Sequence, residues 1–90
     1  MNPPKYPSRI RVAGRERWNV TQRGIVEYAV WQSLHPVTCL ELLHVLEKDF
    51  GVQAGQVYTT QNLISLTDAK RLVRLKRGLY MHACHATMFD

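Results

Sequence analysis

The chain lacks a long apolar run, a glycine-rich phosphate loop and a set of paired cysteines. None of its apolar stretches approaches the roughly 18 residues that a membrane-spanning helix needs, so we expect no membrane partner. The first residues have no apolar core of the kind that a secretory signal requires, and we therefore expect a cytoplasmic protein. Cys39 and Cys84 alone cannot form a disulfide framework, and both thiols are expected to be reduced.

Catalytic and metal-binding patterns are equally sparse. No spacing suggests a Ser or Cys nucleophile with a His and an acid, so we predict that the chain is not an enzyme and needs no cofactor. Two groups carry metal-ligand types, namely His82-Ala83-Cys84-His85 and the set His35, Cys39 and His44. Neither group has the paired Cys-x2-Cys spacing of a structural zinc site, and we predict no metal.

The distribution of charge is the first positive signal in these 90 residues, which form one expected domain. Residues 1–23 hold six Lys/Arg and one acid, residues 24–69 hold Lys48 against five acids, and residues 70–77 hold five Lys/Arg and no acid. Two basic segments around an acidic middle favour a polyanionic partner. The alternative interpretation of either segment alone is a solvated surface.

The first expected helix begins at Asn19 or Thr21, both of which are good N-cap residues. Its apolar stripe consists of Ile25, Val26, Ala29, Val30 and Leu34. The helix must end before Pro36, because the residue before a proline is pushed out of the α region. The His35–Val37 connection is expected to be extended.

The second expected helix starts with a capping box. Thr38 and Glu41 have the Ser/Thr-x-x-Glu spacing, in which the Thr hydroxyl bonds the N–H three residues on and the Glu reaches back to the N–H of Thr38. Gly51 stands where a left-handed C-terminal residue belongs. We therefore predict a helix between these residues.

A third helix is expected over residues 56–66, with neutral hydrogen-bonding groups on its polar face. A strand over residues 57–60 is the alternative, because these residues are β-branched or aromatic. In that case Thr67-Asp68 would cap a later helix running to Leu75. We prefer the earlier helix, since the later one would leave no partner strand for Leu79–Ala83.

Residues 70–80 are β-prone and basic, with a turn expected at Lys76-Arg77-Gly78. At the other end, residues 1–7 hold three prolines and are expected to be an extended, mobile tail. Residues 8–18 alternate basic and apolar side chains and can be an edge strand or an arm. The expected organisation is a basic arm over residues 1–18 and a domain over residues 19–90.

The order of helix, helix and basic hairpin, together with Val57-Tyr58-Thr59-Thr60, resembles bacterial winged helix-turn-helix regulators over about residues 20–83. The resemblance implies an α+β fold with three helices and a C-terminal hairpin as the wing. It also implies a transcriptional regulator that binds double-stranded DNA as a homodimer or with a partner regulator. The expected recognition helix departs from this pattern in having no Arg or Lys.

The physical reading of the same residues supplies a candidate DNA interface. Gln61 and Asn62 can each pair with adenine, and a Thr methyl can touch a thymine methyl. Basic side chains of a wing can contact phosphates or the minor groove. The candidate DNA-binding residues are Tyr58, Thr59, Gln61, Asn62, Ser65, Lys70, Arg71, Arg74, Lys76 and Arg77.

Two other functions remain open from the sequence. A protein-interaction module would explain an uncharged third helix and the aromatic residues Trp18 and Trp31. An RNA or single-strand binder would use Tyr58 and Tyr80 as stacking platforms. Arg9, Arg11, Arg15 and Arg17 are either a minor-groove arm or a soluble N-terminal segment.

Overall fold

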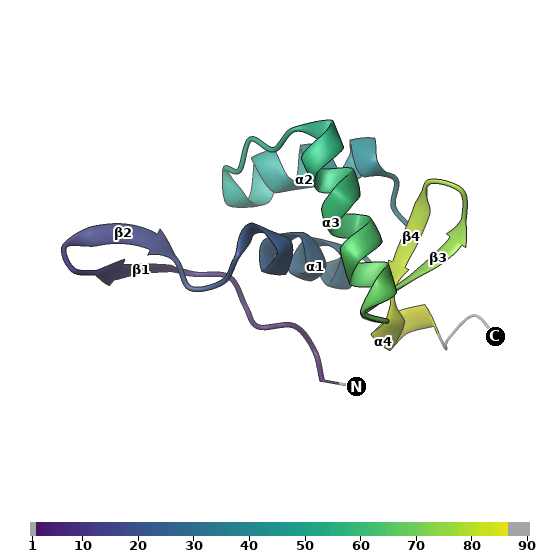
Figure 1. The fold of residues 1–90 in the computed structure, drawn as a ribbon, viewed down its shortest axis with the longest axis horizontal. Helices are drawn as coiled ribbons and strands as arrows, with labels where there is room; N and C mark the ends of the chain where they lie inside the picture. Colours follow the sequence, from purple (N-terminus) through teal and green to yellow (C-terminus); the bar gives the residue numbers. More distant parts are fainter. Residues whose placement is uncertain (1, 87–90) are drawn as a thin grey trace.

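The computed structural model describes residues 2–86 and has an α+β architecture with two separate antiparallel strand pairs (Figure 1). In chain order the elements are β1 (Arg9–Val12), β2 (Arg15–Trp18), α1 (Gln22–Gln32), α2 (Cys39–Phe50), α3 (Gln56–Asp68), β3 (Leu72–Lys76), β4 (Leu79–His82) and α4 (Ala83–Ala86). The three long helices pack against one another, and the β3–β4 pair covers the open end of this helical cluster.

Helix α1 begins after Thr21, whose hydroxyl accepts a hydrogen bond from the Gly24 N–H at 3.2 Å. The predicted apolar stripe is confirmed for the four residues within the helix, which are all buried: Ile25, Val26, Ala29 and Val30. Leu34 was wrongly placed in that stripe. The helix ends two residues earlier and leaves the Leu34 side chain 74% exposed.

Helix α2 has the predicted boundaries. The Thr38 hydroxyl accepts from the Glu41 N–H at 3.2 Å, and Gly51 closes the helix in the left-handed conformation with φ of 65°. The second half of the capping box is different from the prediction. The Glu41 carboxylate accepts from the Thr38 hydroxyl at 3.2 Å rather than from the backbone N–H of Thr38.

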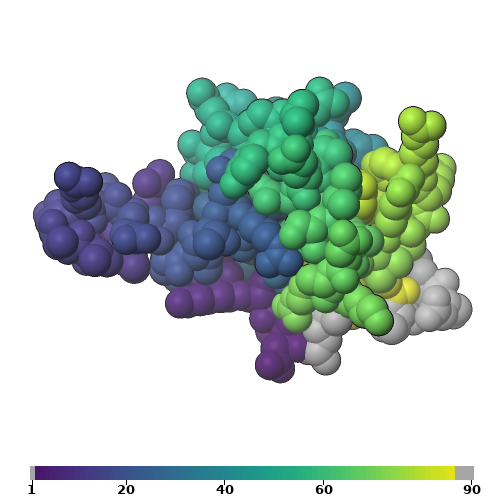
Figure 2. Space-filling model, viewed as in Figure 1, coloured from purple at the N-terminus to yellow at the C-terminus, as the bar shows by residue number. Residues whose placement is uncertain are grey.

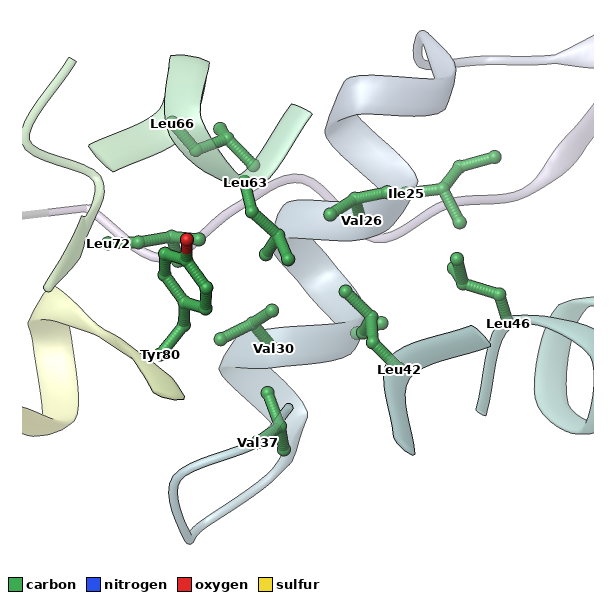
Figure 3. Close-up of a cluster of buried hydrophobic side chains, with 11 residues drawn as sticks. Ile25, Val26, Val30, Val37, Leu42, Leu46, Leu63, Leu66, Leu72 and Tyr80 are labelled. Carbon is green, nitrogen blue, oxygen red and sulfur yellow. The ribbon is translucent and has the colours of Figure 1, made fainter. Parts of the chain in front are cut away.

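Residues 56–68 are helical, so the alternative with a strand over residues 57–60 is wrong. Leu63 and Leu66 on α3 and Leu42 and Leu46 on α2 all belong to one buried core. This core is completed by Ile25, Val26 and Val30 from α1 and by Val37, Leu72 and Tyr80 from the extended segments (Figure 3). Burial of this leucine-rich face outweighs the β propensity of residues 57–60.

Strands β3 and β4 form the expected basic hairpin, and the chain reverses at Arg77 and Gly78, where Gly78 has φ of 76°. The register shifts between Arg74 and Lys76. The expected extended connection before α2 is confirmed, because Val37 pairs with Tyr80 in an isolated antiparallel bridge. The hairpin is thereby tied to the segment between α1 and α2.

The segment 8–18, for which an edge strand or an arm was expected, forms a hairpin of its own at one end of the molecule (Figure 1). Ala13 and Gly14 make its two-residue turn with φ of 53° and 77°, which is the backbone combination of a type I′ turn. The preceding residues lie against α1 rather than away from the domain. Pro7 is buried there, and the Tyr6 ring packs edge-on against Tyr28 with 5.2 Å between centroids.

Candidate nucleic-acid interface

The outward face of α3 carries apolar and neutral polar side chains and no cation. Its exposed residues include Val57, Tyr58, Gln61, Ile64 and Ser65. Exposure reaches 73% for Val57, 50% for Tyr58 and 49% for Ile64, which is unusual for such large apolar groups on one face. The large apolar side chains of this face therefore either contact a partner or remain exposed to solvent.

Two predicted site residues on α3 do not lie on this face. Thr59 is fully buried and Asn62 is 8% exposed, so neither side chain is placed to contact a base in this chain. The reason is helical geometry, since residues four positions apart share one face. Thr59 stands four residues before Leu63, and Asn62 stands four before Leu66, so the core leucines turn both polar side chains inward.

The hairpin β3–β4 lies beside the exposed face of α3, and most of its predicted cations are available. Lys70, Arg74, Lys76 and Arg77 are all exposed. Lys70 adopts φ of 62° in the turn that joins α3 to the hairpin. A pocket of about 90 Å³ lies where helix and hairpin meet, and it is lined by Ile64, Thr67, Asp68, Arg74 and Tyr80.

Arg71 was predicted to contact DNA, but its side chain is engaged within the chain. Its Nε donates to Glu27 Oε2 at 2.8 Å, with a second contact from the guanidinium at 2.6 Å, and it also donates to the Asn2 carbonyl at 3.0 Å. The side chain is 28% exposed. Arg71 therefore fastens the start of β3 to α1 and to the N-terminal segment.

Arg23 on α1 lies at this site, although it was not among the residues predicted from the sequence. Its Nε donates to the Ser65 hydroxyl at 3.0 Å. This contact brings the Arg23 guanidinium to the edge of the exposed face of α3. Helix α3 itself has no Lys or Arg. No sequence spacing could have indicated it, because Arg23 and Ser65 meet only through the packing of α1 against α3.

A buried polar cluster fixes the hairpin relative to α1. His82, which is fully buried, donates from Nε2 to Glu27 Oε2 at 2.9 Å. Its Nδ1 accepts from the Cys84 N–H at 3.1 Å. These two bonds define the Nε2–H tautomer of a neutral ring.

The pKa values of both His82 and Glu27 lie below their ordinary values. Burial lowers the pKa of His82, and the Arg71 and His85 charges act in the same direction, while Glu27 opposes them. Burial alone would raise the pKa of Glu27, but hydrogen bonds from Arg71 and His82 outweigh it and lower the pKa. The cluster is thus a neutral histidine beside an ionised carboxylate paired with Arg71.

Several of the candidate metal ligands named from the sequence make structural contacts instead, whereas His44 is exposed. His85 Nε2 lies 2.7 Å from the Trp31 carbonyl, and its ring stacks on Trp31. The Cys39 thiol lies 3.4 Å from the Thr60 hydroxyl, between α2 and α3. Within residues 2–86 there is no group of three His, Cys, Asp or Glu side chains arranged to hold a metal ion.

Comparison with known proteins gives no match to a family model, to a curated protein or to a solved structure. Among the described residues, no helix has the length and apolar character that crossing a membrane would require.

Proposed function

We propose that this chain is a small winged helix-turn-helix protein that binds double-stranded DNA and regulates transcription. In this assignment α2 and α3 are the helix-turn-helix and β3–β4 is the wing. The bridge between Val37 and Tyr80 supports it, because it ties the wing to the segment before α2. The observation that carries the proposal is the neutral outward face of α3 lying directly beside a cationic hairpin.

The two elements divide the work of recognition. Gln61 presents an amide that can pair with the N6 and N7 atoms of adenine in the major groove. Val57 and Ile64 offer methyl groups suited to thymine methyls, and Tyr58 suits the sugar-phosphate backbone. Such a helix specifies a sequence but attracts DNA weakly, so the phosphate charge is met by Arg74, Lys76 and Arg77.

A protein-interaction module is the second candidate function. The exposed side chains of Val57, Tyr58 and Ile64, together with Leu40 at 65% exposure, favour it because protein interfaces use such groups. The single-strand candidate is weaker than the sequence indicated. Tyr80 is 6% exposed, so its ring is covered by the core and cannot stack on a base.

Binding of fluorescent duplexes at several salt concentrations tests these functions. The DNA upstream of the chain's own gene and a scrambled duplex are compared with their single strands. We expect the logarithm of the duplex binding constant to fall linearly with the logarithm of the salt concentration. We also expect tighter binding to the duplexes than to their single strands. Absence of salt-dependent duplex binding would reject the proposal, and stronger binding to the single strands would favour the stacking function.

A further inference from the structure

The hairpin β1–β2 is a cationic surface that the interface described above does not use. All residues from Arg9 to Arg17 are exposed. The segment holds four arginines against the single acid Glu16. Within residues 2–86, none of these four guanidinium groups forms an ion pair. A concentration of unpaired positive charge on a projecting ribbon is suited to a polyanion.

The strand register divides the hairpin into two faces. Paired residues of antiparallel strands share a face, and successive residues alternate between faces. On one face Arg9 lies over the Trp18 ring at 4.4 Å from its centroid, so this guanidinium is already engaged. The other face carries Ile10, Val12, Arg15 and Arg17. Its two aliphatic side chains are 40% and 45% exposed.

The root of the hairpin is attached to the domain. Ser8 and Asn19 exchange two hydrogen bonds of 2.9 Å, one from each backbone N–H. Trp18 packs edge-on against Phe50 of α2 with 6.3 Å between ring centroids. An isolated two-stranded hairpin is only marginally stable in water, so these contacts give the ribbon a defined direction from the helices.

The position of the hairpin matches a duplex bound to α3. In Figure 1 the hairpin lies at one end of the long axis, β3–β4 lies toward the other end, and α3 stands between them. The extent along this axis is 47 Å, which exceeds the roughly 34 Å of one turn of B-DNA. In Figure 2 atoms of β1–β2, α3 and β3–β4 are all visible on the viewed face of the molecule.

We propose that β1–β2 is a second DNA-contacting element, which grips the flank of the bound duplex opposite to β3–β4. Arg15 and Arg17 contact phosphates and the edge of the flanking minor groove, where arginine is favoured electrostatically. Ile10 and Val12 contact the sugars between them. The proposal rests on the function proposed above, and it predicts a site longer than α3 and β3–β4 alone would cover.

The test compares two double variants that each remove two exposed positive charges. Arg15→Gln with Arg17→Gln changes the hairpin, and Lys5→Gln with Lys48→Gln is the matched control outside the proposed interface. The probe is the tightest duplex selected from a pool with a randomised core of about 20 base pairs, roughly two helical turns. Cross-strand proton contacts between Arg9 and Trp18 and between Arg11 and Glu16, which the variant keeps, verify that its hairpin is formed.

We expect the hairpin variant to reduce the slope of log K against log salt by about 2, one for each lost phosphate contact, while the control keeps the parent slope. Trimming base pairs from one end of the duplex should weaken the parent and leave the hairpin variant unaffected. Trimming the other end should weaken both proteins.

Two results would distinguish failure of the hairpin contact from failure of the proposed function. If the hairpin variant matches the parent in slope and in sensitivity to trimming, while Arg74→Ala weakens binding, the second contact is rejected and the proposed function stands. If the parent binds no duplex in a salt-dependent manner, both proposals are rejected.

Discussion

His82 Nε2 lies 2.9 Å from Glu27 Oε2 in a contact that joins β4 to α1. Arg71 binds the same carboxylate oxygen from the start of β3. One carboxylate therefore sets the position of both strands of the cationic hairpin relative to the helices. Since the pocket between α3 and the hairpin includes Arg74 and Tyr80, the geometry of the candidate interface depends on this cluster.

The cluster predicts that stability falls on acidification. Burial keeps the pKa of His82 below its ordinary value of 6.5, so the unfolded chain takes up this proton at higher pH than the folded chain. The free energy of unfolding therefore falls as the pH drops below the ordinary value. Glu27, with a pKa lowered from 4.5, adds a further loss at more acidic pH. Melting temperatures between about pH 8 and pH 5 measure the first effect.

His82→Phe is the control for this pH dependence. The phenyl ring replaces the imidazole in a fully buried site, and it has no proton to gain. The variant is expected to be less stable at neutral pH, because it leaves Glu27 with one partner fewer. Its melting temperature should nevertheless depend less on pH than that of the parent. Parallel curves for the two proteins would contradict the assignment to His82.

The Thr38 N-cap of α2 should contribute measurably to the free energy of unfolding. Thr38→Ala removes the acceptor of the Glu41 N–H, and the expected cost is about 0.5–2 kcal/mol in the free energy of unfolding. Thr38→Ser keeps a hydroxyl at this position and should recover most of the loss. Chemical denaturation of the three proteins provides the values. A Ser variant as unstable as the Ala variant would attribute the effect to the threonine methyl instead of the cap.

Thr59→Val is expected to stabilise the protein. Thr59 is fully buried, and its hydroxyl has no hydrogen-bond partner among the described residues. Replacing it by a methyl group of similar size removes an unsatisfied polar atom, with an expected gain of about 1 kcal/mol. For a domain of this size the gain corresponds to a rise in melting temperature of about 4–8 °C.

The neighbouring Thr60 offers the matched control. Its hydroxyl donates to the Gln56 carbonyl at 2.8 Å, so Thr60→Val loses a formed hydrogen bond and should not stabilise the chain. Thermal unfolding of both variants gives the comparison. Equal destabilisation by the two substitutions would show that the Thr59 hydroxyl is satisfied in solution.

Local signals were sufficient for both ends of α2 and for the turn of the basic hairpin, but not for the C-terminal ends of α1 and α3. Thr38 and Gly51 indicated the limits of α2 because a cap depends on neighbouring backbone groups. Gly78 indicated the turn because it supplies a positive φ. Burial of α3 was harder to predict, since the polar residues Thr59 and Asn62 share its inward face with two leucines.

Contacts between distant residues could not be predicted. Arg71 was one of several cations in a basic run, and nothing near it in the sequence indicates that it pairs with Glu27, which is 44 residues away. Arg23 reaches Ser65 across a similar separation of 42 residues. Such pairs exist only after the helices have packed. The sequence therefore predicted which segment is cationic but not which of its side chains remain available to a ligand.

The final prediction separates base-specific contacts with DNA from nonspecific electrostatic attraction to its phosphates. If the Gln61 amide reads a base edge as proposed, Gln61→Ala should lose about 1–3 kcal/mol of binding energy on the selected duplex and almost nothing on a scrambled one. If Arg74 and Arg77 contact phosphates as proposed, Arg74→Ala and Arg77→Ala should each weaken binding to both duplexes and reduce the salt slope by about 1. Titrations of the three variants on both duplexes at two salt concentrations measure these differences.

Gln53→Ala is the matched control, since Gln53 is an exposed glutamine that precedes α3; it should bind both duplexes like the parent. The contrast follows from the placement of charge, because the exposed face of α3 has hydrogen-bonding groups without a cation, whereas the hairpin has cations with few groups able to distinguish bases. If Gln61→Ala binds the selected duplex like the parent while Arg74→Ala is weakened, α3 is not the reader. The exposed apolar side chains of α3 would then be better explained by a protein partner held beside DNA.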